Sequence, residues 1–255
     1  MVALIDDFAI PDGMATGCLP RGTVLGDEHS VFEEAIPLIP EEDWIDRIRE
    51  REGMTGLDDL VTKIKNQRNE GSCASNAATQ CEEIVRRIQR GLKHWVSISA
   101  MSLYKRVGSS AGSGSTIDGN LRELKARGAL PSDTPENRER FRHVHPDTGF
   151  DIRLPDGWEE TGVLFKAGEW FDIASWRGII TSAIRGWPIC YGRKGHAICG
   201  VRAVIRNGVI VLKYANSWGN WGDNGFGYDS RQAVENAIRS YGAWALRTTD
   251  YLTVA

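Results

Sequence analysis

Apolar residues spaced three and four positions apart predict five helices along the chain. The clearest begins at Ser72 or Cys73 and ends at Gly91, with arginines in its last turn. The other four are expected over Glu41–Glu52, Ala100–Arg106, Leu121–Ala126 and Ser175–Arg185. Four of the five therefore fall before residue 130, and only one falls in the last third of the chain.

The last third changes to short β-like runs separated by glycine and Asn-Gly turns, of which Asn207-Gly208 is the clearest. The runs are Pro188–Tyr191, His196–Val204, Val209–Tyr214, Gly225–Tyr228 and Trp244–Arg247. Helices followed by strands predict an α+β fold with a helical part and a β part.

Three segments lack a regular pattern. Residues 1–40 are rich in Pro and Gly and predict an extended arm. A Gly/Ser loop is expected over Gly108–Thr116, and long loops with little regular structure over Asp133–Glu160.

Composition narrows the class of protein. The chain has 255 residues, 25% of them charged, with a net charge of −3. These values are typical of a globular protein and do not predict the basic footprint of a nucleic-acid-binding protein. No secretory signal and no membrane-spanning run are visible, so no membrane partner is expected. Nine tryptophans are many, and a surplus can line a groove.

Five cysteines form no CxxC pair, and their number is odd. A disulfide framework is therefore not indicated, and a reducing, cytoplasmic location is expected. We expect Cys81, Cys190 and Cys199 to be apolar core positions. A zinc site from Cys190, His196 and Cys199 is conceivable but lacks the usual ligand spacing. His143 and His145 could bind a metal, but we expect them in a solvated loop.

Cys73 is the sharpest candidate for chemistry. A cysteine acts as a nucleophile in its thiolate form, and the first turn of a helix lowers the thiol pKa. A nearby histidine would act as the base that removes the thiol proton. The Cys73 backbone N–H and the Gln67 side-chain amide could stabilise an oxyanion.

Two later patches supply partners of the required types. His196 begins an apolar strand, and a histidine at a strand edge can point between two halves of a fold. Asn216 follows the run Val209–Tyr214 and can accept a hydrogen bond from an imidazole without adding charge. Trp218 could shield that bond from water.

Together these patches resemble the papain family of cysteine peptidases. His196 and Asn216 follow Cys73 by about 120 and about 140 residues, near the ~130–150 typical of that family. The run Asn216-Ser217-Trp218-Gly219, with the later Trp221–Phe226, is similar to a highly specific family motif. The resemblance covers roughly residues 57–255 and is weakest over 133–165.

The resemblance implies a papain-like fold with a helical left subdomain, a β-barrel-like right subdomain and the active cleft between them. It implies peptide-bond hydrolysis through a thioester, without metal or cofactor, on a peptide or protein substrate. Cys73 would be the nucleophile, His196 the general base and acid, Asn216 the residue that orients it, and Gln67 the oxyanion donor. The implied substrate-cleft residues are Gly112, Ser113, Gly114 and Trp218.

The sequence departs from the family at several points. Glu70 stands where the family has a disulfide cysteine, and its charge is expected to raise the thiol pKa. Ala74 replaces a bulky aromatic residue. The glycine loop also lacks a cysteine, and the connection Tyr191–Gly195 is short, which predicts a more open primed side.

Other functions remain as alternatives. The chain could be a papain-fold structural or binding component of a larger assembly, for example a virion, with weak or no proteolysis. The same thioester would also serve deamidation or transglutamination. The match of residues 108–112 to G-x-S-x-G lacks the strand and helix that a serine hydrolase needs, and the same loop lacks the Lys of a phosphate-binding loop.

These observations predict two regions. Residues 57–255 form the peptidase domain, with a helical part over about 68–165 and a β part over about 166–255. Residues 1–56 form an N-terminal arm, which could be a propeptide, a strap around the domain, or an extension that docks on an assembly partner.

Overall fold

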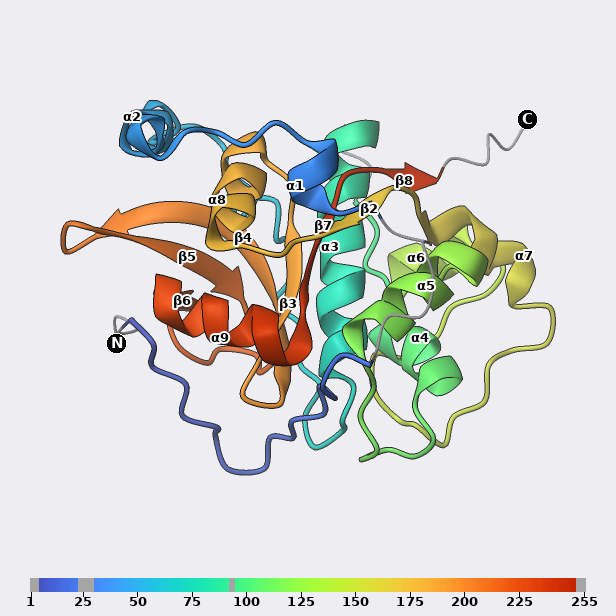
Figure 1. Ribbon diagram of the computed structural model, residues 1–255. Helices are drawn as coiled ribbons and strands as arrows, with labels where there is room; N and C mark the ends of the chain where they lie inside the picture. Colours follow the sequence, from blue (N-terminus) through green and yellow to red (C-terminus); the bar gives the residue numbers. More distant parts are fainter. Residues whose placement is uncertain (1–4, 23–29, 92–94, 251–255) are drawn as a thin grey trace.

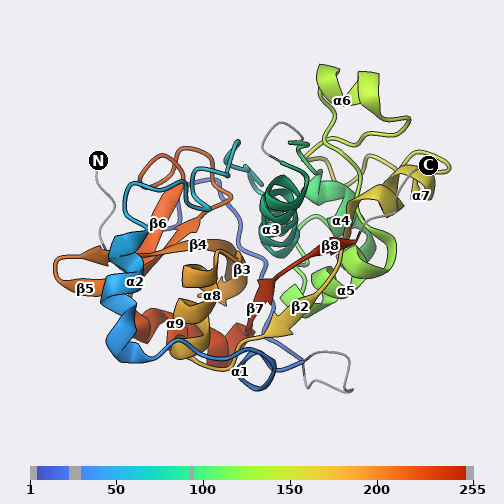
Figure 2. The same cartoon turned by 90° about the horizontal axis from the view of Figure 1, so that it is seen from above.

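The computed structural model describes residues 5–22, 30–91 and 95–250, and the chain is built in two halves (Figure 1). The helical half consists of α3 (Cys73–Arg90), α4 (Ala100–Val107), α5 (Ile117–Arg127), α6 (Pro135–Arg140), α7 (Glu159–Gly162) and the 3-10 turn η3 (Val163–Phe165). Figure 2 shows α3 end-on between the sheet and the other helices of this half. Helix α3 is therefore the element that both halves share.

The other half is a six-stranded antiparallel sheet. Its strands, in spatial order, are β2 (Trp170–Asp172), β7 (Ala243–Leu246), β3 (Ile189–Arg193), β4 (His196–Arg206), β5 (Val209–Ala215) and β6 (Phe226–Asp229). A separate pair joins β1 (Lys166–Ala167) to β8 (Thr249–Asp250). The remaining elements are α1 (Phe32–Ala35), η1 (Glu41–Asp43), α2 (Trp44–Glu50), α8 (Trp176–Arg185) and α9 (Arg231–Tyr241).

Local sequence explains where the main elements begin and turn. Side-chain oxygens of the residues before α4, α5, α8 and α9 accept backbone N–H bonds from the first turn; these caps are Ser99, Thr116, Ser175 and Ser230. Each such cap is worth about 1 kcal/mol. Two-residue turns join β3 to β4 and β4 to β5, and all four turn residues have positive φ, as a type I′ hairpin requires: Lys194, Gly195, Asn207 and Gly208.

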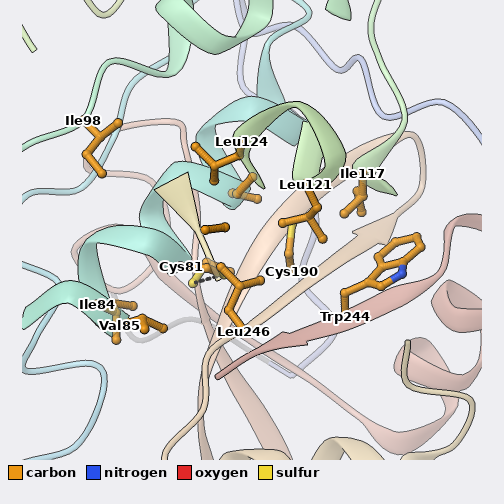
Figure 3. Packing of buried hydrophobic residues seen from close by; sticks show 14 of the residues in the cluster. Cys81, Ile84, Val85, Ile98, Ile117, Leu121, Leu124, Cys190, Trp244 and Leu246 are labelled. Atoms are coloured by element: carbon orange, nitrogen blue, oxygen red, sulfur yellow. Dashed lines mark hydrogen bonds between the residues drawn. The ribbon is translucent and has the colours of Figure 1, made fainter. Parts of the chain in front are cut away.

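Two apolar clusters form the core, and the first of them joins the halves. The first lies between α3, α5 and the sheet, and Figure 3 shows its residues, with Ile84, Leu121 and Trp244 among them. The second packs the sheet against α8 and α9 and also includes Phe32 and Trp44 from the N-terminal region. No helix among the described residues has the length and hydropathy to cross a membrane.

The α+β class and the order of helices before strands are confirmed. All five expected helices and all five expected strands are present, with ends shifted by a few residues; α5 begins at Ile117 because Thr116 caps it. The expectation of loops over Asp133–Glu160 was wrong at α6, where Thr134 caps a helix that starts with Pro135. The expectation of a solvated loop at His145 was also wrong, because this side chain is buried.

Helix α9 was not predicted. Its sequence carries Ser230 as a cap, Val234 and Ile238 at helical spacing, and Gly242 after its end. These signals were present, but the segment lies between two strands of a region dominated by short β-like runs.

Candidate functional site

Cys73 is the first residue of α3, and its side chain is fully buried. Burial raises the pKa of the thiol to about 11, although hydrogen bonds from the backbone N–H groups of Ala197, Gly17 and Ala74 act in the opposite direction. The thiol is therefore protonated at neutral pH in this form of the protein.

His196 begins β4, and the backbone N–H of the next residue, Ala197, hydrogen-bonds the Cys73 sulfur, so the start of β4 lies at the start of α3. Its Nε2 lies 2.8 Å from Oδ1 of Asn216. That oxygen also accepts the Ser217 N–H at 2.7 Å, so it serves as an acceptor and assigns the ring proton to Nε2. Nδ1 is then the basic nitrogen, and it is buried without a hydrogen-bond partner among the described residues.

The imidazole is neutral as well as oriented. Burial lowers the pKa of His196 to about 4, against a smaller upward effect of the Asn216 hydrogen bond. The Trp218 ring stacks on the imidazole with centroids 4.2 Å apart. Trp218 thus lies where the sequence predicted a shield for the His196–Asn216 bond.

Gln67 is fully buried beside the start of α3. Its Oε1 accepts from the Ser217 hydroxyl at 2.6 Å, which leaves the amide nitrogen as the donor end. Nε2 donates to the carbonyls of Glu70, at 2.8 Å, and Ala15, at 3.0 Å. The donor that we expected to face an oxyanion therefore faces a carbonyl of the N-terminal arm.

Residues 5–22 of that arm, which we call the covering segment, start beside β6 at the outer edge of the sheet half and run below this half to the interface between the two halves (Figure 1). The N–H groups of Gly17 and Cys18 both donate to the Gly195 carbonyl, at 3.0 and 2.8 Å. The Ser115 N–H donates to the Gly17 carbonyl at 2.8 Å, so the segment bonds to both halves at once.

Gly17 occupies the tightest point of this path. A Cβ added to Gly17 would lie 2.2 Å from the Gly71 carbonyl oxygen, and one added to Gly114 would lie 2.3 Å from the Gly17 carbonyl oxygen. Only glycines allow backbones to approach so closely. Gly17 thus threads between Gly71 and the glycine loop, directly beside Cys73.

Aromatic packing holds the earlier part of the segment. The Phe8 ring lies 5.7 Å from the His196 ring and 5.3 Å from the Trp218 ring. The indole nitrogens of Trp218 and Trp221 donate to the carbonyls of Ala15 and Ala9. The short β3–β4 connection was expected to leave the primed side open, but this segment covers the histidine.

The glycine loop is placed only in part as expected. Gly112 and Gly114 face Gly71, where an added Cβ would lie 2.9 Å from the Gly114 nitrogen. The Ser113 hydroxyl instead accepts the N–H groups of Ser109 and Ser110, at 2.9 and 3.1 Å. Ser113 therefore shapes its own loop.

Glu70 does not act on the thiol as we expected. Its Oε1 accepts the N–H groups of Gly149 and Phe150, both at 2.9 Å, and burial rather than Glu70 raises the Cys73 pKa. Glu70 thereby ties the loop before α3 to a distant loop. Ala74 is fully buried in the core cluster around α3.

Sequence reasoning missed the residues that reach the site through their backbone. They are Ala15, Gly17, Cys18, Ser115 and Gly195. The only signal in the sequence was the glycine content of the arm around Gly17 and of the loop around Gly114, the two segments that meet there. Among the described residues, no three His, Cys, Asp or Glu side chains are grouped to hold a metal ion.

Comparison with known proteins gives structural relatives only. No family model matches the sequence, and no curated protein matches it. Xylellain, a cysteine protease from Xylella fastidiosa, superposes with a TM-score of 0.64 at 15% identity, over 95% of this chain and 100% of that one. Procathepsin L2 from the Tenebrio molitor larval midgut gives 0.63 at 17% identity, over 94% and 80%.

A third neighbour, procathepsin B S9 from Trypanosoma congolense, gives a TM-score of 0.58 at 15% identity, over 93% of this chain and 87% of that one. Identities this low establish the fold alone. The chain has the papain-like fold, with a helical half and an antiparallel sheet; Cys73 begins α3 and His196 begins β4.

Proposed function

We propose that this protein is a papain-like cysteine peptidase held in a latent form by its covering segment. One observation carries the proposal: the backbone at the start of β4 hydrogen-bonds the sulfur of a cysteine at a helix start, and the histidine that begins β4 has its Nε2 proton fixed by Asn216, which leaves Nδ1 as the basic nitrogen. This combination is the arrangement that nucleophilic acyl transfer needs.

The reaction follows from the positions of these groups. Nδ1 of His196 takes the thiol proton, and the Cys73 sulfur attacks the substrate carbonyl carbon. The oxyanion is stabilised by Nε2 of Gln67 and by the Cys73 N–H, which has no partner within the helix. His196 then returns the proton to the leaving amine, and it later activates the water that hydrolyses the thioester.

The covering segment accounts for latency in this proposal. The Ala15 carbonyl uses the Gln67 amide proton that an oxyanion would need. Gly17 fills the space between Gly71 and Gly114 beside the thiol. A substrate must displace both contacts, and the Cys73–His196 pair regains water when they leave.

A point substitution tests the proposal without shortening the chain. Gly17→Val places a side chain against the Gly71 carbonyl and should expel the segment. This variant should cleave a denatured protein substrate and create new N-termini, while the double variant Gly17→Val/Cys73→Ala should create none. Equal cleavage by both would contradict the proposal, as would cleavage by neither when the segment is shown to be displaced.

A further inference from the structure

Two thiols from opposite halves of the molecule touch behind the candidate site. Cys81 lies on α3 and Cys199 on β4, and their sulfurs are 3.3 Å apart. Figure 3 draws this contact as a dashed line at Cys81. A disulfide has a sulfur–sulfur bond of ~2.04 Å, so closure needs an approach of only about 1.3 Å.

The two thiols stand on the elements that carry the candidate catalytic pair. Cys81 follows Cys73 by about two helical turns, and Cys199 lies on the same strand as His196. The sulfurs are buried in the cluster that joins the halves, with exposures of 0% and 1%. A bond between them would tie α3 to β4.

We propose that Cys81 and Cys199 are a redox-active pair that closes to a disulfide stapling the two halves together. The oxidant is a low-molecular-weight disulfide such as oxidised glutathione. One thiolate attacks it and releases one thiol; the second thiolate then attacks the mixed disulfide, releases a second thiol and leaves the protein oxidised by two electrons. The staple does not depend on peptidase activity.

A third sulfur provides the control. Cys190 on β3 lies opposite Cys199 in the β3–β4 register and also contacts Cys81. It shares their burial and their cluster. Cys81 hydrogen-bonds with both thiols, and we assign the staple to the pair whose sulfurs lie 3.3 Å apart. Removing Cys190 should leave the staple intact, whereas removing Cys199 should abolish it.

The staple should stabilise the fold strongly, because the two cysteines are 118 residues apart in the sequence. A long closed loop restricts the unfolded chain most. For a chain of this length we expect oxidation to raise Tm by about 5–10 °C.

The test is equilibration of the full chain with reduced and oxidised glutathione, in enough urea to open the interface, followed by acid quenching and non-reducing tryptic mapping. The expected product joins the peptide of residues 69–86 to that of residues 195–202, and it persists in the Cys73→Ala variant, which assigns the bond to Cys81. Cys190→Ala should keep both the crosslink and the rise in Tm.

Cys199→Ala should lose both the crosslink and the rise in Tm. A wild-type map without this crosslink, or one that joins residues 186–193 instead, would overturn the proposal. The wild-type map decides the question even where a variant folds poorly. Because the readout is a crosslink, its failure is independent of any failure to detect peptidase activity.

Discussion

The two halves hold the covering segment by different chemistry. The helical half holds it by close backbone approach, with Gly17 between Gly71 and Gly114 and a hydrogen bond from Ser115. The sheet half adds large side chains, because Phe8 packs on His196 and Trp218. The Gly195 carbonyl at the β3–β4 turn anchors the same segment.

The contact at Gly17 therefore depends on steric fit, whereas the contact at Phe8 depends on apolar packing. A contact made of glycines tolerates no added atom, so a single Cβ should break it. A contact made of rings weakens in proportion to the surface removed. The two kinds of substitution should therefore release the segment to different extents while leaving Cys73 and His196 untouched.

The largest expected effect comes from removing the candidate nucleophile Cys73, which begins the helix that both halves share. In the Gly17→Val background, Cys73→Ala should reduce peptide hydrolysis by at least about 10³-fold, because no other group replaces the thiolate. Initial rates with a fluorogenic peptide check this. Cys190→Ala is the matched control, since it removes a buried thiol from the same cluster, and its rate should be retained.

Breaking the steric contact should have the next largest effect. We expect Gly17→Val to accelerate alkylation of Cys73 by about 10²-fold, since the thiol returns to water and to an ion pair with His196. Gly22→Val is the control, because an added Cβ there meets nothing within 4 Å. Equal acceleration in both variants would show that the contact at Gly71 does not hold the segment.

The pH dependence sharpens the contrast between covered and open forms. With the Cys73 pKa at about 11 and the His196 pKa at about 4, the covered pair is uncharged between these values. Wild-type alkylation by iodoacetamide should rise about tenfold per pH unit from pH 6 to 9, because the thiolate fraction does.

The open form should behave differently. Gly17→Val should show a plateau from near neutral pH, since an imidazolium beside the thiolate lowers the thiol pKa. Alkylation rates measured across the same buffers decide between the two shapes. A plateau in the wild type would mean that the segment does not keep the pair neutral.

Weakening the aromatic contact should have the smallest effect. Phe8→Ala removes ring contacts worth about 1 kcal/mol beyond simple burial, which corresponds to roughly fivefold faster alkylation. Ile10→Ala serves as the control, because Ile10 is 50% exposed. If Phe8→Ala released the segment as fully as Gly17→Val, the sheet half would be the dominant anchor.

The sequence predicted the candidate site better than it predicted the covering segment. Cys73, His196 and Asn216 stand in motifs whose order and spacing are specific, so their meeting at one interface could be expected. The path of residues 5–22 could not, since it depends on backbone bonds to Gly195 and Ser115 that leave no pattern in either partner.

The structure also changed the expected electrostatics of Cys73. The helix start should lower the Cys73 pKa, and Glu70 should raise it. Burial dominates instead, while Glu70 bonds to the N–H groups of Gly149 and Phe150. Burial by a distant segment is a tertiary property that local sequence does not encode.

In the proposed mechanism, Cys73 becomes an activated thiol once the covering segment leaves. The most direct measurement is intact mass after treatment with a peptidyl epoxide at neutral pH, for wild type, Gly17→Val and Gly17→Val/Cys73→Ala. We expect rapid addition of one label to Gly17→Val, slow addition to the wild type, and none to the double variant. Labelling of wild type and Gly17→Val at the same rate, or no labelling of Gly17→Val in a folded protein, would contradict it.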